Sequence, residues 1–262
     1  NIYWLKKDLR LADNQALTAA CESDLPLILL YVYEPEMWAQ DDASFRHLVF
    51  LNQSLQDLQE SCNERQIFLN IFHGEVSNIL SNLTCKYEIK NLYSHQETGN
   101  FWSFQRDLKV KEFCQQHNIA WHQFSQNGVI RGLKNRDGWS AKWHLKMSQQ
   151  ILKIPEKINS LKVSNGDLIK PEILGLKNDG IENAQIGGRR NALKILNDFL
   201  YSRGENYTKE MSSPVSAFSS CSRISPYLTF GSISVREVFQ IASLRRQEIT
   251  SRPKNQQGKW PS

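Results

Sequence analysis

Apolar residues recur along the first 125 residues in two alternating patterns. Short runs rich in β-branched and aromatic residues occur at Ile2–Leu5, Leu27–Val32, Ile67–Phe72, Lys90–Ser94 and Ile119–Phe124. Between these runs, apolar positions are spaced three and four residues apart, most clearly over Ala43–Asn63 and from Asn100 through Phe104, Leu108 and Cys114. The runs predict strands and the spacing predicts helices. Strands that alternate with helices indicate a mainly parallel sheet with helices on both faces.

The alternation stops after residue 130, and we place the end of a first, α/β domain there, at 1–130. Proline, glycine and Asn-Gly turn residues are scattered between residues 153 and 186. A long irregular stretch of this kind is typical of an interdomain connection, so we assign 131–186 as a connector. Only helical patterns follow, including the capping-box sequence of Ser234–Glu237. The last segment, 187–262, is therefore predicted to be all-α.

Charge is distributed unevenly between these segments. The formal net charge is +5, yet residues 187–262 hold twelve cations and five acids, a net charge of +7. The first 186 residues therefore carry a net charge of −2. A basic C-terminal part is typical of proteins that bind a polyanion, such as nucleic acid or a phosphate-bearing cofactor. A solvated basic surface accounts for the charge equally well.

Several classes of protein are excluded by what the sequence lacks. It contains no run of about twenty apolar residues, no C-x-x-C among its five cysteines and no H-E-x-x-H among its six histidines. The glycine-rich fingerprints of dinucleotide dehydrogenases and P-loop enzymes and the serine elbow of esterases are also missing. We therefore expect no metal, no membrane partner and a cytoplasmic location with reduced thiols. Because the chain starts with Asn1 and ends abruptly at Ser262, we also expect it to be part of a longer protein.

Two strings carry local chemistry. In Trp4–Leu17, an apolar strand leads into a cationic loop, after which Asp13 or Asn14 can cap the next helix. In Ser219–Leu228, clustered hydroxyls surround one arginine in a turn ahead of a helix. Hydroxyls, backbone N–H groups and a guanidinium are what a pyrophosphate or a ribityl chain requires. A serine-rich turn that only caps a helix is the alternative interpretation.

Together these strings resemble the DNA photolyase and cryptochrome family. The opening is similar to its signature W-x-R-x-D-L-R-x-x-D-N-x-A-L, and the stretch from Gly187-Gly188 to Gly231 resembles the start of its helical flavin domain. The string His95–Asn100, followed by Arg106-Asp107, resembles a bacterial branch of the family. The resemblance spans the whole chain. It implies an α/β, Rossmann-like parallel-sheet N-terminal domain followed by a truncated all-α FAD-binding domain.

The resemblance also implies a cofactor and the residues that hold it. By motif position, the contacts to FAD come from Tyr207, Cys221, Ser222, Arg223, Ile224 and Ser225. The family usually has threonine at the position of Cys221, so this chain has a thiol where the family has a hydroxyl. The catalytic residues are expected beyond Ser262, so this chain alone is expected to be inactive. A second, antenna chromophore of unknown identity is compatible with the family.

The function implied is that of a deoxyribodipyrimidine photo-lyase, a carbon–carbon lyase. Such enzymes use blue light and reduced FAD to split pyrimidine dimers in DNA by electron transfer. The partner would then be dimer-containing DNA, bound by a monomer. The first alternative is a cryptochrome, a blue-light photoreceptor without repair activity. A remote alternative is a nucleotide-binding α/β module without flavin.

Overall fold

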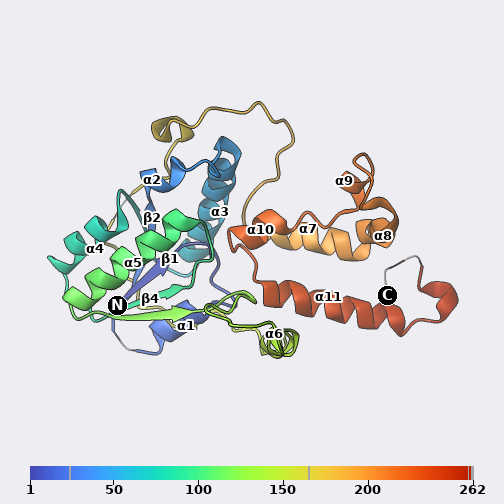
Figure 1. The fold of residues 1–262 in the computed structure, drawn as a ribbon, viewed down its shortest axis with the longest axis horizontal. Coiled ribbons are helices and arrows are strands. Elements are labelled where there is room, and N and C mark those ends of the chain that lie inside the picture. The colour runs from blue at the N-terminus through green and yellow to red at the C-terminus, as the bar shows by residue number, and fades with distance from the viewer. Residues whose placement is uncertain (24, 165, 259, 261–262) are drawn as a thin grey trace.

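A five-stranded parallel sheet forms the N-terminal half of the molecule (Figure 1). The structure is a computed structural model that describes residues 1–23, 25–164, 166–258 and 260. The sheet has the order β3-β2-β1-β4-β5, and every pairing is parallel. Its strands are β1 (Ile2–Leu5), β2 (Ile28–Tyr33), β3 (Leu69–His73), β4 (Asn91–His95) and β5 (Ala120–Phe124). The predicted α/β class and parallel sheet are confirmed.

Alternation along the strands divides the core between the two faces of the sheet. In β1, Tyr3 and Leu5 belong to one apolar cluster, whereas Ile2 and Trp4 belong to another. The first cluster is covered by α1 (Gln15–Cys21), which follows β1, and by α3 (Phe45–Asn63). The short α2 (Pro35–Trp38) lies between β2 and α3 in the chain. The second cluster is covered by α4 (Val76–Thr84) and α5 (Phe101–Gln116). Helices thus cover both faces of the sheet, and the first face also receives Trp38 of α2.

Helix α5 exists where the spacing predicts it, but the three apolar residues that predicted it do not share a buried face. Cys114 packs on the sheet, whereas Phe104 and Leu108 are exposed. The residues of α5 that face inward include the charged pair Arg106 and Asp107. The spacing of apolar residues therefore predicted the helix correctly but did not show which of its sides is buried.

Among its described residues, the segment between 131 and 186 is irregular apart from α6 (Trp139–Met147), the 3₁₀ turn η1 (Pro171–Leu174) and a parallel β-bridge between Ser160 and Leu27. It nevertheless packs closely on the sheet domain. Met147 and Ile169 are buried, and the side-chain amide of Asn52 in α3 donates to the Ile169 carbonyl at 2.8 Å. Helix α6 was not foreseen. The three segments drawn from the sequence, 1–130, 131–186 and 187–262, stay predictions.

Only helices occur among the described residues after Gly188, as the sequence predicts. They are α7 (Arg189–Tyr201), η2 (Arg203–Asn206), α8 (Tyr207–Glu210), α9 (Ala217–Ser220), α10 (Ser225–Thr229), α11 (Val235–Thr250) and η3 (Lys254–Gln256). The capping box is present, because Ser234 and Glu237 cap each other's backbone N–H groups at the start of α11. No helix in the described part of the chain is long and apolar enough to span a membrane.

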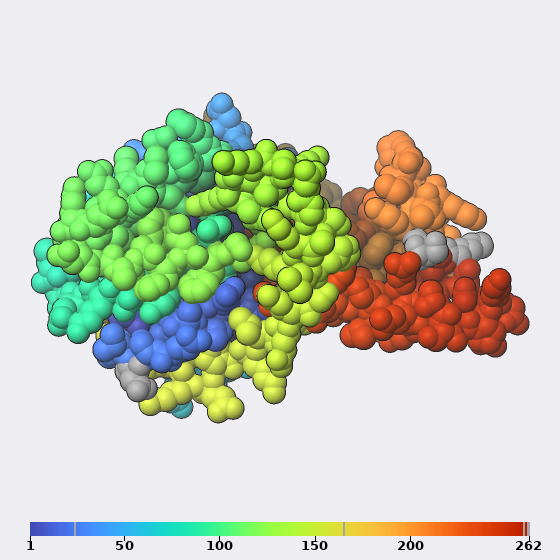
Figure 2. All heavy atoms as spheres, turned by 60° about the horizontal axis from the view of Figure 1, so that its bottom comes forward, coloured from blue at the N-terminus to red at the C-terminus, as the bar shows by residue number. Residues whose placement is uncertain are grey.

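The helical part projects from one end of the sheet domain, with α6 beside the junction (Figures 1 and 2). Helix α3 joins the two parts. Its Phe50 packs in the helical core, while its Ser54 and Asp57 accept hydrogen bonds from the backbone N–H groups of Gly188 and Arg189 at 3.0 and 2.8 Å. These two acceptors satisfy donors at the start of α7 that have no partner within the helix.

Candidate cofactor site

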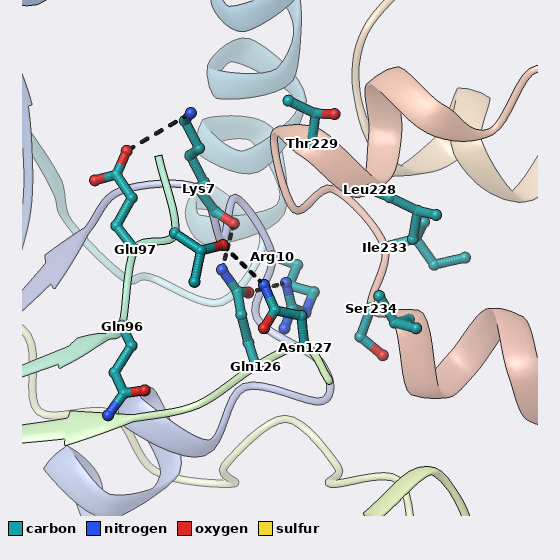
Figure 3. Close-up of a pocket in the computed structure, with 12 residues that line it drawn as sticks. Lys7, Arg10, Gln96, Glu97, Gln126, Asn127, Leu228, Thr229, Ile233 and Ser234 are labelled. Carbon is teal, nitrogen blue, oxygen red and sulfur yellow. Dashed lines mark hydrogen bonds and ion pairs between the residues drawn. The ribbon is translucent and has the colours of Figure 1, made fainter. Parts of the chain in front are cut away.

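The order of the strands reverses between β1 and β4, and a pocket lies at the carboxyl ends of these two strands. Open α/β sheets bind ligands in such a crevice, because the chains leaving the two strands turn to opposite faces. The pocket has a volume of about 220 Å³. Lys7 follows β1, Glu97 follows β4 and Gln126 follows β5, and they face Thr229 and Ser234 of the helical part (Figure 3). We call it the switch-point pocket.

The polar side chains of the switch-point pocket are held by one another. The side-chain amide of Gln126 donates to the Lys7 carbonyl at 2.8 Å, and its oxygen accepts from Arg10 at 3.2 Å (Figure 3). Asn127 donates to the Thr98 hydroxyl at 3.2 Å. The Lys7 ammonium lies 3.6 Å from Glu97 Oε1. The pocket is thus a fixed polar surface between the two parts of the molecule.

The opening motif meets the end of the Gly187–Gly231 stretch, and the capping box that follows it, beside this pocket. Arg10 of the opening motif donates to the Gly231 carbonyl at 2.9 Å, and the Leu9 N–H donates to the Phe230 carbonyl at 3.2 Å. Asp13 accepts from the Ser234 hydroxyl at 2.5 Å. Residues more than two hundred positions apart are thereby joined. The sequence could not show this contact, although it singled out both strings.

A buried cluster of charges lies next to the pocket, and Arg106 of α5 is at its centre. Its guanidinium lies 2.9 Å from Glu34, 2.5 Å from Glu97 and 2.9 Å from Asp107. Lys6 lies 3.2 Å from Asp107. All five side chains are at least nine-tenths buried. We call this group the buried charge cluster.

Burial and charge act in opposite directions on the carboxyls of this cluster. Burial raises the pKa of Glu34 to about 7, although Arg106 opposes the shift. Burial also raises the pKa of Glu97, but Arg106, Lys6 and Lys7 outweigh it and leave the pKa below its usual value. Among the described residues, the carboxyl that pairs with a single cation holds a proton more readily than the one that pairs with two. Glu34 is that carboxyl.

Glu34 should give the protein a measurable pH dependence. Its pKa is about 7 in the folded chain and 4.5 in a solvated carboxyl, so the folded state binds the proton more tightly. The free energy of unfolding should therefore fall as the pH rises through this window, by up to about 1 kcal/mol per pH unit. Urea unfolding of the wild type and of Glu34→Gln at a series of pH values measures this. As the pH is lowered from 7 to 5, the free energy of unfolding of the wild type should rise relative to that of the variant. Parallel plots of this free energy against pH would contradict the assignment.

A larger cavity, of about 830 Å³, opens where the sheet domain, the connector and the helical part meet. The sheet domain contributes Trp38, Arg46 and His47, and the helical part contributes Phe218 and further residues of the 218–230 stretch. Charged groups of both signs reach it, with cations at Lys7, Arg46 and Arg223 and acids at Asp42, Glu97 and Glu182. We call it the interdomain cavity. Its mixture of apolar and charged walls suits a ligand with an aromatic part and an anionic part.

Two of the six residues assigned to FAD line the interdomain cavity, Arg223 and Ser225. Arg223 has a backbone φ of +57°, and its guanidinium lies 3.9 Å above the centre of the Phe218 ring. Gln185 of the connector donates to the Arg223 carbonyl at 2.7 Å and holds this turn. Ser225 is exposed at the first position of α10.

The other four residues assigned to FAD lie outside the lining of that cavity. Tyr207 begins α8 and packs edge-to-face on Phe199, with ring centres 5.8 Å apart. Ile224 is buried in the helical core, and the carbonyl of Cys221 accepts from Arg203 at 2.5 Å. Ser222 stands half-buried between them. All six assignments remain predictions about the cofactor.

The cavity residues of the sheet domain were not predicted. Arg46 and His47 lie in the first turn of α3, beyond the carboxyl end of β2. Their sequence is that of an ordinary solvated first turn of a helix. The rule that ligands bind at the carboxyl ends of parallel strands is the signal that would have drawn attention to them.

A family model for DNA photolyase matches residues 1–135. The chain is 29% identical to cryptochrome-1 of Sinapis alba over 98% of its length and 54% of that protein. It is 25% identical to the deoxyribodipyrimidine photo-lyase of Buchnera aphidicola subsp. Acyrthosiphon pisum (strain APS), over 92% of this chain and 53% of that one. The chain thus spans about half the length of these curated relatives.

Solved structures show the same fold. A cryptochrome of Synechocystis sp. PCC6803 matches with a TM-score of 0.79 at 21% identity, covering 96% of this chain and 56% of the other. An archaeal photolyase from Sulfolobus tokodaii, described with two FAD molecules, matches with a TM-score of 0.71 at 21% identity, over 95% of this chain and 57% of the other.

Proposed function

Because the chain belongs to the DNA photolyase family, we propose that it is part of an FAD-dependent DNA photolyase that repairs pyrimidine dimers with blue light. The observation that carries the proposal is the meeting of the two motifs. The opening motif lies in the matched residues 1–135, and it binds the 230–234 turn through Arg10 and Asp13. That turn follows the stretch assigned to FAD, which opens on the interdomain cavity.

FAD, when bound, supplies light absorption and the electron that splits the dimer. The residues of the interdomain cavity fit the phosphate-bearing part of this cofactor. Arg223 offers a guanidinium and Ser225 a hydroxyl, and charge-assisted hydrogen bonds from such groups hold phosphates. The volume of about 830 Å³ lies in the range of cofactor pockets. By motif position, the resemblance to the family adds Tyr207, Cys221, Ser222 and Ile224 as further contacts.

The protein would bind the cofactor and exclude water from it, whereas DNA would be bound by the basic C-terminal part. The net charge of +7 on residues 187–262 supports a phosphate-backbone partner. The dimer would reach the flavin by leaving the base stack, as bases do in other enzymes that act on them. A second chromophore, of unassigned identity, remains a prediction.

An absorption and repair assay on the chain extended to the full length of its relatives tests the proposal. The purified protein should show flavin bands that bleach in blue light with a reductant present. It should also convert a dimer-containing oligonucleotide to intact pyrimidines under light and not in darkness. A protein that takes up no FAD on reconstitution would overturn the proposal and leave a nucleotide-binding module without flavin.

A cryptochrome is the second candidate, because the 29% identity to the Sinapis alba protein extends over 98% of the chain. The same assay separates the two candidates. A cryptochrome without repair activity would bleach in light and leave the dimer intact, whereas a photolyase would remove it.

Arg223 provides a specific test of the cofactor site. Arg223→Ala removes the guanidinium that lines the cavity and should weaken FAD binding about tenfold, the effect of losing one charge-assisted hydrogen bond. The dissociation constant is measured by flavin fluorescence during titration of the apoprotein. Arg246→Ala on the exposed face of α11 makes the same change of charge and should leave the constant unchanged. Equal affinities of the two variants would remove Arg223 from the site.

A further inference from the structure

A stretch near the end of the connector, residues 177–184, lies on the surface between the sheet domain and the helical part. All eight residues are exposed, and they belong to no helix or strand. Figure 1 shows the chain here as an open arch that runs from η1 to the start of α7. We call residues 177–184 the strap.

Both ends of the strap are fixed. On the sheet-domain side, Leu174 and Leu176 pack against the first apolar cluster of the sheet. On the helical side, the Tyr227 hydroxyl donates to the Ile186 carbonyl at 2.8 Å. The strap is therefore a short bridge between two anchored points, so its middle can move while its ends stay in place.

One ion pair ties the middle of the strap to the rest of the described chain. Arg46 Nε of α3 lies 2.7 Å from a carboxylate oxygen of Asp179. The other hydrogen bonds described for the strap are internal, because the Asn178 and Asp179 side chains accept from the N–H groups of Gly180 and Ile181. Arg46 is half-exposed, and an exposed pair of this kind shifts an equilibrium by no more than about fivefold. The tie is weak enough to open without disturbing either part.

The strap is also a wall of the interdomain cavity. Its residues 181–184 line the cavity, and Arg46 lines it from α3. Trp38 and Phe50 on other walls are buried, whereas Ile181 on the strap is 46% exposed. An apolar side chain that lines a cavity and is only half covered gains contacts when a ligand fills the cavity.

Other acids near Arg46 do not replace Asp179 as its partner. Asp42 and Glu182 line the same cavity, but neither forms an ion pair with Arg46 within the described residues. The Asp42 carboxylate instead accepts from the Asn100 amide at 3.1 Å. The contact between Arg46 and Asp179 is thus the one that reaches from α3 to the strap.

We propose that the strap is a lid on the interdomain cavity, latched by Arg46 and Asp179 and closed on the ligand by Ile181. The inference rests on the proposed function, because it takes FAD as the ligand. A lid must open to load its ligand and close to keep water out. The weak latch permits opening, and the contact between Ile181 and the ligand favours the closed state only while the cavity is filled.

Trypsin cleavage after Lys177 measures the opening of the strap and needs no flavin. The cleavage rate follows the population of the opened strap when cleavage is slow. Arg46→Gln removes the latch without changing the sequence around the cut and should raise this rate about twofold to fivefold. Arg65→Gln, which removes an exposed pair with Glu64 just beyond the other end of α3, should leave the rate unchanged. Mass spectrometry identifies the cut, and equal rates in the wild type and Arg46→Gln would overturn the latch.

Release of FAD from the chain extended to the full length of its relatives tests the closure on the ligand. Ile181→Ser removes the apolar contact and should increase the dissociation rate at least about threefold, as followed by flavin fluorescence after dilution. Ile173→Ser is the matched control, since Ile173 is an exposed isoleucine of the same connector outside the lining of the cavity. Equal release rates in Ile181→Ser and the wild type would overturn the role of Ile181.

FAD should also protect the strap from cleavage. A saturating concentration should slow the cut after Lys177 at least about threefold, because fewer molecules are then open. The cut after Lys134, an exposed residue ahead of α6, should stay unchanged. If FAD binds without protecting Lys177, the strap is not a lid. If the chain takes up no FAD, the proposed function fails, whereas the comparison of Arg46→Gln with the wild type still decides whether the latch exists.

Discussion

Replacing Arg106 with leucine is expected to lower the free energy of unfolding by about 3–5 kcal/mol, the usual effect of removing one member of a buried ion pair. The guanidinium binds Glu34, Glu97 and Asp107 at 2.5–2.9 Å. Without it, three buried carboxyls face the buried ammonium of Lys6 and two half-exposed cations, Lys7 beside Glu97 and Arg131 at 3.8 Å from Asp107. The carboxyls must then either take up protons or draw water into the core. Both responses favour the unfolded chain.

Urea unfolding followed by circular dichroism measures the loss. Lys109→Ala is the control. Lys109 lies on the same helix and pairs with Glu75 at 3.5 Å, but both of these side chains are exposed. Removing an exposed pair should cost less than about 1 kcal/mol. Similar losses in the two variants would show that Arg106 does not organise the interior.

The sheet was predictable because its signals are local. Each strand is a short apolar run between turns, and the predicted strands agree with the observed ones to within about two residues at their ends. The position of the helix α3 could be predicted from the spacing of its leucines for the same reason. The order of the strands could not, because it depends on which runs pair across long stretches of chain. The sequence therefore predicted a parallel sheet but not the reversal between β1 and β4 that creates the pocket.

The site was predictable only in part. Arg223 and Ser225 stand in a recognisable string, and the structure places them at the interdomain cavity. Four members of the buried charge cluster also stand in strings that resemble the family, namely Lys6, Glu97, Arg106 and Asp107. Nothing in those strings shows that they meet in the interior, and arginine is seldom buried. Arg106 is buried because carboxyls from the ends of β2 and β4 meet it in space. Contacts of this kind become visible only when the strands are assembled.

The second large effect is expected at Gly231, where Gly231→Ala should lower the free energy of unfolding by about 2–5 kcal/mol. The backbone φ of Gly231 is +69°, which costs an L-residue about 1–2 kcal/mol. A Cβ there would lie 2.2 Å from the Lys7 carbonyl oxygen and 2.5 Å from the Asp8 Cα, both backbone atoms that cannot turn aside. Overpacking of this kind adds about 1–3 kcal/mol. The shift would also stretch the Arg10 and Leu9 hydrogen bonds that join the two parts.

Gly138→Ala separates the two causes. Gly138 has nearly the same φ, +67°, but no atom of the described residues lies within 4 Å of the position of its Cβ. Its substitution should therefore show the backbone cost alone, about 1–2 kcal/mol in urea unfolding. The difference between the two variants measures how closely the turn before α11 is pressed against the loop after β1. If both variants lost the same stability, that contact would be loose, and the joining of the two motifs could not support a shared cofactor site.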